Sequence, residues 1–291
     1  MLAWAAEKPL RLAVFQGHEL ENFFMTKIVE IYKQVFSMLQ KNPTVLFLFL
    51  ILGIFDAIAL TILFFAPIPP VSYVLAPIIR TFWTDQFLHY PYNFLLLPKL
   101  FGHAHFLIST VIGVFISGLI IKKIEADTKG ETISTLFAFG FVLKKYISLV
   151  VAWLISYGVF TVGLKGLLYL LPKNLLIQMA GGFVLALLIQ SIFAFLLPSL
   201  IIVDQGFLRS FLEGLRCGLK NVGIMSAIFA VPMLLVFAAS FAKLYTSLFV
   251  QIYPELVLWV LAGGIVITLV VDILITSSAT LMFLKVRNKK S

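Results

Sequence analysis

The chain has 291 residues, of which 61% are hydrophobic and only 12% are charged, and its mean hydropathy is +1.07. Soluble globular domains carry about a quarter charged residues, so this composition excludes a soluble protein and places most of the chain in lipid. The net charge of +9 is explained by basic loops at a membrane surface, where they contact anionic lipid, so we expect no nucleic-acid partner. The single cysteine, Cys217, excludes an internal disulfide framework.

Residues 1–23 are interpreted as an interfacial tail. Glu7, Lys8 and Pro9 interrupt the apolar stretch that a secretory signal peptide requires. The regular pattern of the rest of the chain begins near the second methionine, so translation starts either at Met1 or at Met25 in our interpretation. N-terminal sequencing of the native protein distinguishes the two.

Six apolar stretches are long enough to cross a membrane, because about 20 helical residues at 1.5 Å each span the hydrocarbon core. We predict one membrane domain at 24–285 and a basic cytoplasmic tail at 286–291, with spans at about 44–66, 105–121, 147–170, 175–197, 223–244 and 256–284. The connection 67–103 is rich in aromatic residues and proline. Its apolar pieces are too short to span, so we expect interfacial or re-entrant segments there.

An amphipathic unit precedes every second span, at 24–41, 132–145 and 203–220. Aligned on a lysine, the three units read FSMLQK, FGFVLK and LRCGLK. Apolar residues recur at helical spacing on one face, which is typical of a helix lying in the membrane interface. The predicted fold is therefore all-α, with three helical hairpins that each follow a cytoplasmic amphipathic helix. Asp204 would cap the third such helix. Four lysines of these units are expected to contact lipid headgroups: Lys41, Lys144, Lys145 and Lys220.

Basic residues are distributed unequally between the two sides of the predicted membrane domain. Six spans place both termini on one side, and most of the 22 lysines and arginines fall in segments on that side. The residues on the other side are Arg80, Lys99, Lys165, Lys173 and Lys243. By the positive-inside rule, both termini are cytoplasmic and the protein is a multi-pass protein of the inner (plasma) membrane.

Two acidic residues lie near the middle of predicted spans, Asp56 in the first and Asp272 in the sixth. A charge at the bilayer centre costs at least about 2.5–3.5 kcal/mol on insertion scales, so both are candidate functional residues. The sixth span adds hydroxyl groups at Thr268, Thr276 and Ser277. Two interpretations stay open. The aspartates are protonated or hydrogen-bonded structural residues, or they line a path for an ion, a proton or a substrate.

Three histidines lie close together in the sequence, His89, His103 and His105. Residues two apart share a metal only from a strand or loop, and no cysteine or paired carboxylate accompanies them. We therefore favour anchoring at the interface over a metal site, and we expect no metal and no cofactor. The spacing of Gly214 and Gly218 indicates close packing of the third amphipathic helix on a neighbouring span.

No catalytic or nucleotide-binding motif is present in the sequence. There is no P-loop, HExxH, GxSxG or CxxC pattern, so we expect a protein that is not an enzyme.

The repeat, most visible at Pro198, Asp204, Leu215 and Lys220-Asn221, resembles a group of bacterial six-span membrane proteins. That group includes the membrane domain fused to some glycerophosphodiester phosphodiesterases, and the resemblance covers roughly 25–285. Because this sequence contains no phosphodiesterase domain, the resemblance implies only a membrane-resident role linked to lipids or to a partner protein.

Together, these patterns favour a non-enzymatic integral inner-membrane protein with an accessory or scaffold role in envelope or lipid homeostasis. Its expected partners are membrane lipids and other membrane proteins. The alternative is a small transporter or permease-like subunit that uses Asp56 and Asp272, and a membrane-embedded enzyme of lipid metabolism is a third interpretation. The two aspartates discriminate between these classes, because a transporter needs them to titrate in a polar cavity whereas a scaffold tolerates asparagine.

Overall fold

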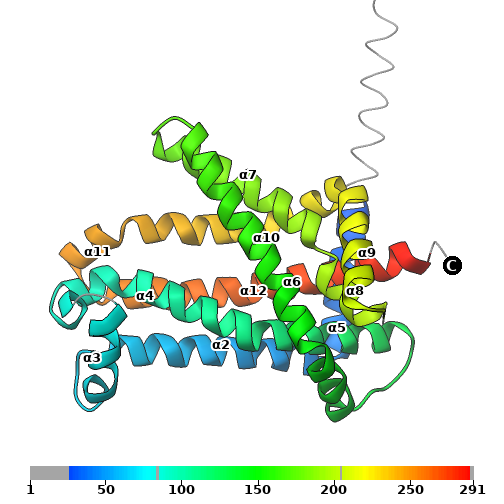
Figure 1. The fold of residues 1–291 in the computed structure, drawn as a ribbon, viewed down its shortest axis with the longest axis horizontal. Coiled ribbons are helices and arrows are strands. Elements are labelled where there is room, and N and C mark those ends of the chain that lie inside the picture. The colour runs from blue at the N-terminus through cyan, green and yellow to red at the C-terminus, as the bar shows by residue number, and fades with distance from the viewer. Residues whose placement is uncertain (1–25, 83–84, 204, 289–291) are drawn as a thin grey trace, which may run out of the picture.

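The computed structural model describes residues 26–82, 85–203 and 205–288, and every regular element within these ranges is a helix. Six of the helices are long and apolar enough to cross a membrane, as the sequence predicted, and the protein is a multi-pass all-α membrane protein (Figure 1). The predicted tail at 1–23, the alternative start at Met25 and the predicted cap at Asp204 lie outside the described residues.

The spans follow the chain in order, with short helices between them. The six spans are α2 (Pro43–Phe64), then α4 (Tyr92–Ile108) continued by η2 (Ser109–Gly113) and α5 (Val114–Thr128), then α6 (Thr135–Leu170), α7 (Leu175–Phe193) with α8 (Leu196–Ile202), α10 (Val222–Leu244) and α12 (Leu256–Asn288). The shorter connecting helices are α3 (Val71–Phe82), η1 (Asp85–Leu88), α9 (Phe207–Lys220) and α11 (Thr246–Ile252).

Local sequence explains where several spans begin. Pro43 occupies the first turn of α2, where its missing N–H is not needed. The Ser134 hydroxyl accepts a hydrogen bond from the backbone N–H of Phe137 at the start of α6. The Asn174 side chain does the same for two backbone N–H groups at the start of α7. These caps satisfy donors that lipid cannot satisfy.

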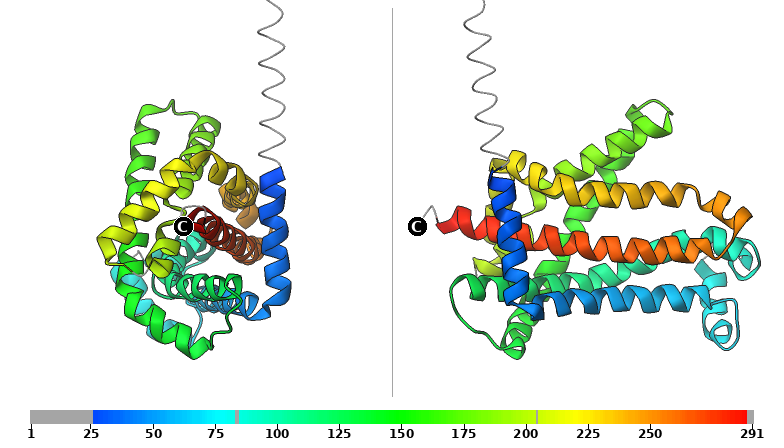
Figure 2. Two further views of the ribbon diagram at one scale, coloured as in Figure 1. Left: turned by 90° about the vertical axis from the view of Figure 1, so that its right-hand side faces the viewer. Right: turned by 180° about the vertical axis from the view of Figure 1, so that it is seen from behind.

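One helix, over residues 26–41, lies across the bundle rather than along it (Figure 2). Its apolar face enters the main core through Ile31, Val35, Met38 and Leu39. The Tyr32 hydroxyl donates to the backbone oxygen of Ile228 on α10, and burial raises the pKa of Tyr32 to about 12. We call the end of the bundle with this helix, α9 and the last residues of α12 the basal end, and the opposite end, with α3 and α11, the distal end (Figures 1 and 2).

The second amphipathic unit differs from the prediction. Residues 135–145 are not a separate surface helix, because α6 runs without interruption from Thr135 to Leu170. This segment is more apolar than the other two units, and no proline or glycine breaks the helix between it and the span that follows. Two of the predicted surface helices, at residues 26–41 and α9, are separate elements.

The second span begins earlier than predicted. The helix starts at Tyr92, whereas the sequence suggested a start at His105. Pro98 lies inside α4 without ending it, as occurs when neighbouring helices satisfy the freed backbone groups. Within the connection 67–103, only α3 and η1 remain as short segments, and they close the distal end around the fully buried Phe87.

The helix α9 packs directly on the backbone of the fourth span. A Cβ atom added to Gly214 would lie 2.9 Å from the backbone oxygen of Phe195, and one added to Gly218 would collide with the backbone oxygen of Ile192. Both glycines are buried. The predicted use of the Gly214–Gly218 spacing in close packing is therefore confirmed. The N-cap position of α9 falls on Gly206.

The pair α6–α7 leans away from the other spans toward the distal end (Figures 1 and 2). The two helices contact each other, while α7 also contacts α10. Large apolar side chains on α6 are exposed, including Leu154, Ile155, Val159 and Val162, which suits contact with lipid chains. This lean leaves space between α6–α7 and the helices α10 and α12.

Candidate functional site

A hydrogen-bonded pair joins the first two spans in their interior. Asp56 on α2 is 3% exposed. The Nδ1 atom of His105 on α4 lies 3.0 Å from its Oδ1 atom, and the other ring nitrogen, Nε2, lies 3.4 Å from the Ser109 hydroxyl. Removing water from a carboxylate without giving it a partner is strongly unfavourable, and His105 is that partner. The His105 ring is thus held from two directions, by Asp56 at Nδ1 and by Ser109 at Nε2.

Asp272, the second predicted acid, lies beside this pair. It is partly buried on α12, and it borders a narrow gap between α2 and α12 that Asp56 and Thr268 also border. The gap has a volume of about 10 Å³, which is about the space that one water molecule needs. Asp56 and His105 both act electrostatically on Asp272. We call Asp56, His105 and Asp272 the polar cluster.

The close approach of α2 and α12 at the gap depends on a glycine. A Cβ atom added to Gly53 would lie 2.6 Å from the side chain of Leu269. Gly53 precedes Asp56 by almost one helical turn, and Leu269 precedes Asp272 by the same spacing. The two helices therefore meet at the level of the two aspartates, and apolar side chains close the gap on the remaining sides.

A π-helical turn, η2, begins at Ser109, one helical turn after His105 in the second span. Such turns widen an α-helix locally and leave backbone groups without their usual partners. Here Tyr146 on α6 donates a hydrogen bond of 2.8 Å to the backbone oxygen of Val111. Gly113 in η2 is buried and lies near Leu52 of α2. The turn thus sets the direction of α4 relative to α5, and with it the place of His105.

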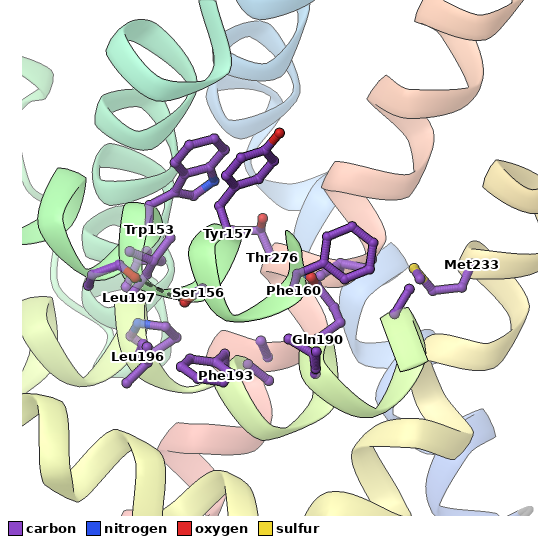
Figure 3. Close-up of a pocket in the computed structure, with 18 of the residues that line it drawn as sticks. Trp153, Ser156, Tyr157, Phe160, Gln190, Phe193, Leu196, Leu197, Met233 and Thr276 are labelled. Atoms are coloured by element: carbon purple, nitrogen blue, oxygen red, sulfur yellow. Dashed lines mark hydrogen bonds between the residues drawn. The ribbon is translucent and has the colours of Figure 1, made fainter. Parts of the chain in front are cut away.

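A second feature lies further along α12, at Ile275, Thr276 and Ala279. It is a cavity of about 420 Å³ bordered by residues of α5, α6, α7, α8, α10 and α12 (Figure 3). Most of its lining is apolar or aromatic. Trp153 and Tyr157 on α6 stack in parallel with their ring centroids 5.4 Å apart, and both line the cavity together with Phe160. We call this space the apolar cavity.

Few polar side chains line the apolar cavity. They include Ser156, Gln190 and Thr276. The Ser156 hydroxyl already donates to the backbone oxygen of Ala152 (Figure 3). Tyr157 and Gln190 border the cavity and are also exposed at the surface of the bundle. The cavity therefore reaches the outside of the bundle beside these two residues, next to exposed apolar side chains of α6.

The remaining predicted site residues fall in different places. Thr276 lines the apolar cavity rather than the polar cluster. Ser277 and Ser278 are buried, and their hydroxyls have no hydrogen-bond partner among the described residues. The predicted headgroup contacts Lys41, Lys144 and Lys220 are exposed and Lys145 is partly buried. Lys145 also lies 5.9 Å from the ring centroid of Phe141.

The other two histidines do not join His105. His103 Nδ1 lies 2.7 Å from the backbone oxygen of Lys99. His89 Nε2 lies 3.4 Å from Asp85, in the distal end of the molecule, and both are exposed. Hydrogen bonds from Arg80 and then from His89 hold the pKa of the Asp85 carboxyl below its usual value. Within the described residues, no group of three or more His, Cys, Asp or Glu side chains is arranged to hold a metal ion.

Sequence reasoning identified Asp56, Asp272 and Thr268 but did not connect them with His105. The sequence placed His105 at the interface because the span was taken to begin there. The apolar cavity was not predicted, because its lining comes from six helices and no single segment marks it. Searches of protein families, of curated proteins and of solved structures find no match for this chain.

Proposed function

We propose that this protein is a non-enzymatic, multi-pass inner-membrane protein that holds a membrane lipid in the apolar cavity and serves as an accessory or scaffold in envelope or lipid homeostasis. The observation that carries the proposal is the cavity of about 420 Å³ between the leaning pair α6–α7 and the rest of the bundle. Ligand sites in proteins commonly measure about 300–1,000 Å³, so the space suits one chain of a lipid.

The chemistry of the lining favours an acyl chain over a polar solute. Burying a polar group without a hydrogen-bond partner is unfavourable, and the lining offers few polar side chains. The aromatic stack of Trp153 and Tyr157 provides a flat apolar wall (Figure 3). Because the cavity reaches the outside at Tyr157 and Gln190, beside lipid-facing side chains of α6, an acyl chain can enter sideways from the bilayer without crossing water.

Basic residues on the basal end support the same proposal. Lys41 and Lys220 are exposed there, on the two separate surface helices that cross the end of the bundle. Cations at this level attract anionic headgroups of the cytoplasmic leaflet. We therefore propose an orientation in which the basal end and both termini face the cytoplasm and the amphipathic helices lie in the membrane interface.

Native mass spectrometry of the full chain, purified from membranes in a mild detergent, tests the proposal. Ala186 on α7 lines the cavity, so Ala186→Phe fills part of it. Ala180 lies on the same helix but is exposed and does not line the cavity, which makes Ala180→Phe the matched control. We expect wild type and the control to retain lipid and Ala186→Phe to lose most of it. A wild-type chain without lipid, or equal retention in all three proteins, contradicts the proposal.

The second candidate is a small transporter or permease-like subunit. The observation in its favour is that Asp56 and Asp272 border one gap. The gap holds about one water molecule, so a solute would need a different conformation to pass. This candidate predicts charge movement in proteoliposomes on a solid-supported membrane, abolished by Asp272→Asn. The absence of such currents in wild type counts against it.

A further inference from the structure

The polar cluster has no part in the proposed binding of lipid and needs an explanation of its own. We propose that Asp56, His105 and Asp272 form a proton-binding site inside the membrane-spanning bundle, whose ligand is the hydrogen ion. The site is built from three spans, with the carboxyls on α2 and α12 and the imidazole on α4. It shares α12 with the apolar cavity but lies earlier along that helix, at residues 265–272 rather than 275–279.

Geometry places a proton-sharing pair at the centre of the site. His105 Nδ1 and Asp56 Oδ1 are 3.0 Å apart, so one hydrogen lies between them. At the opposite ring nitrogen, the Ser109 hydroxyl is 3.4 Å away. Imidazole and carboxyl groups both exchange protons near neutral pH when they are coupled. Within the described residues, we find no hydrogen bond to the third member, Asp272.

The net charge of the site decides how many protons it holds. Two ionised aspartates and a neutral imidazole carry a charge of −2. Adding one proton to the imidazole, which gives an imidazolium beside ionised Asp56, brings the charge to −1. With a second proton on Asp272, the site is neutral. A net charge away from water is unfavourable in a membrane interior, so in this proposal the neutral form is the resting state, with the imidazolium beside ionised Asp56 and the second proton on Asp272.

Among the side chains that the structure describes, no other charged group neutralises the site. The helices packed against the cluster carry further titratable residues, namely Tyr92, Lys99 and His103 on α4, Lys122, Lys123, Glu125 and Asp127 on α5, and Lys285 and Arg287 on α12. Lys122 pairs with Glu125 near the end of α5, and Lys285 pairs with Glu30 at the basal end. Among the described residues, the charged groups that act on Asp272 are His105 and Asp56.

The size of the gap excludes larger ligands. At about 10 Å³, it admits one water molecule between the two carboxyls, and such a water would relay a proton from Asp272 to Asp56. Thr268 adds a hydroxyl to the same lining. A proton therefore needs no opening of the helices at this point, whereas an organic solute does.

Infrared spectroscopy of the full chain in bilayers of ether-linked phospholipids tests the proposal, because these lipids lack the ester carbonyl that would mask protonated carboxyl groups. We expect wild type to show a protonated-carboxyl band at neutral pH that shifts in heavy water and disappears as pH rises. Asp272→Asn should remove the band. Asp127→Asn, at an exposed acid at the end of α5, is the matched control and should leave it unchanged.

A further variant gives a signature that a purely structural role does not. In His105→Gln, the amide still reaches Asp56 but cannot hold the positive charge, so Asp56 should itself become protonated and add a second carboxyl band. If wild type shows no protonated carboxyl at neutral pH, the proposal is wrong. It is also wrong if the band is present in Asp272→Asn, or if sodium ions remove the band at constant pH. The wild-type band is the first readout, so an unstable variant leaves the test intact.

Discussion

The polar cluster and the apolar cavity lie at different levels along one helix, α12, and they differ in nearly every physical respect. Asp272 borders a gap of about 10 Å³ with Asp56, whereas Thr276, one helical turn later, lines a cavity of about 420 Å³. The first is closed by tight packing at Gly53, and the second is left open by the lean of α6–α7. One helix thus serves two sites through residues four positions apart.

The comparison shows that different interactions stabilise the two sites. At the polar cluster, two carboxyls must share protons or partners because lipid offers neither. At the apolar cavity, the side chains have no such requirement, and a lipid chain can complete the packing that the helices leave unfinished. We therefore expect substitutions in the two regions to affect different measurements.

The largest loss of unfolding free energy is expected for a substitution in α9, which packs on the fourth span next to the apolar cavity. Gly218→Ala places a Cβ atom against the backbone oxygen of Ile192, which cannot move as a flexible side chain does. We expect the free energy of unfolding, measured in bicelles, to fall by an amount near the upper end of the range of about 1–3 kcal/mol for overpacking. Lipid retention should fall while the carboxyl band of the polar cluster stays. Gly223→Ala is the control, since a Cβ atom there meets nothing within 4 Å.

Breaking the polar pair should have the next largest effect. Asp56→Ala leaves His105 without its carboxylate partner, and the expected loss of unfolding free energy is about 2 kcal/mol. On the apolar cavity, Gln190→Ala removes an exposed polar side chain and should change stability by less than about 0.5 kcal/mol. Equal losses of unfolding free energy in the two variants would show that the Asp56–His105 pair stabilises the bundle no more than an exposed polar side chain does.

Two matched substitutions on α12 sharpen the comparison further. Thr268 lines the gap and Thr276 lines the apolar cavity. Thr268→Val should lower the free energy of unfolding by about 0.5–1 kcal/mol and shift the carboxyl band of Asp272. Thr276→Val should leave that band where it is. A shift in both variants, seen by infrared spectroscopy, would mean that the two sites along α12 are not independent.

The smallest effect is expected for an ion pair outside the membrane interior. Lys285 donates a hydrogen bond of 2.8 Å to Glu30, and this bond and the lysine charge hold the pKa of Glu30 below its usual value. A carboxyl with a lower pKa in the folded state stabilises it above the unfolded pKa and loses that effect as pH falls through the folded pKa. The pair is exposed, so water screens it.

Hydrogen exchange in residues 26–41 measures that effect. Exchange should rise slightly as the pH drops below about 4, and Glu30→Gln should abolish this dependence on pH. If acid releases the helix equally in wild type and in the variant, the pair does not contribute to its docking.

Much of the fold was predictable from hydropathy. Six spans emerge because lipid demands long apolar helices, and Asp56 and Asp272 stand out against such segments. The prediction of a separate second amphipathic helix was wrong, because nothing in the local sequence ends α6 between residues 135 and 147.

The composition of the site was less predictable. Pro98 and Lys99 interrupt the apolar run before His105, so a hydropathy window starts the span too late and assigns His105 to the interface. In the folded chain α4 begins at Tyr92, which carries His105 into the interior beside Asp56. The apolar cavity depends on the angle between the α6–α7 pair and the other spans. This angle results from packing between helices, and no periodic pattern in the sequence of α6 or α7 indicates it.

Electron cryomicroscopy of the wild-type chain in lipid nanodiscs tests the central claim most directly, namely that the space beside α12 is a lipid site. We predict an elongated density between α6, α7, α10 and α12, in contact with Trp153 and ending near Gln190. A cavity that is empty, or that has closed because α6 and α7 pack flat against α12, would contradict the account.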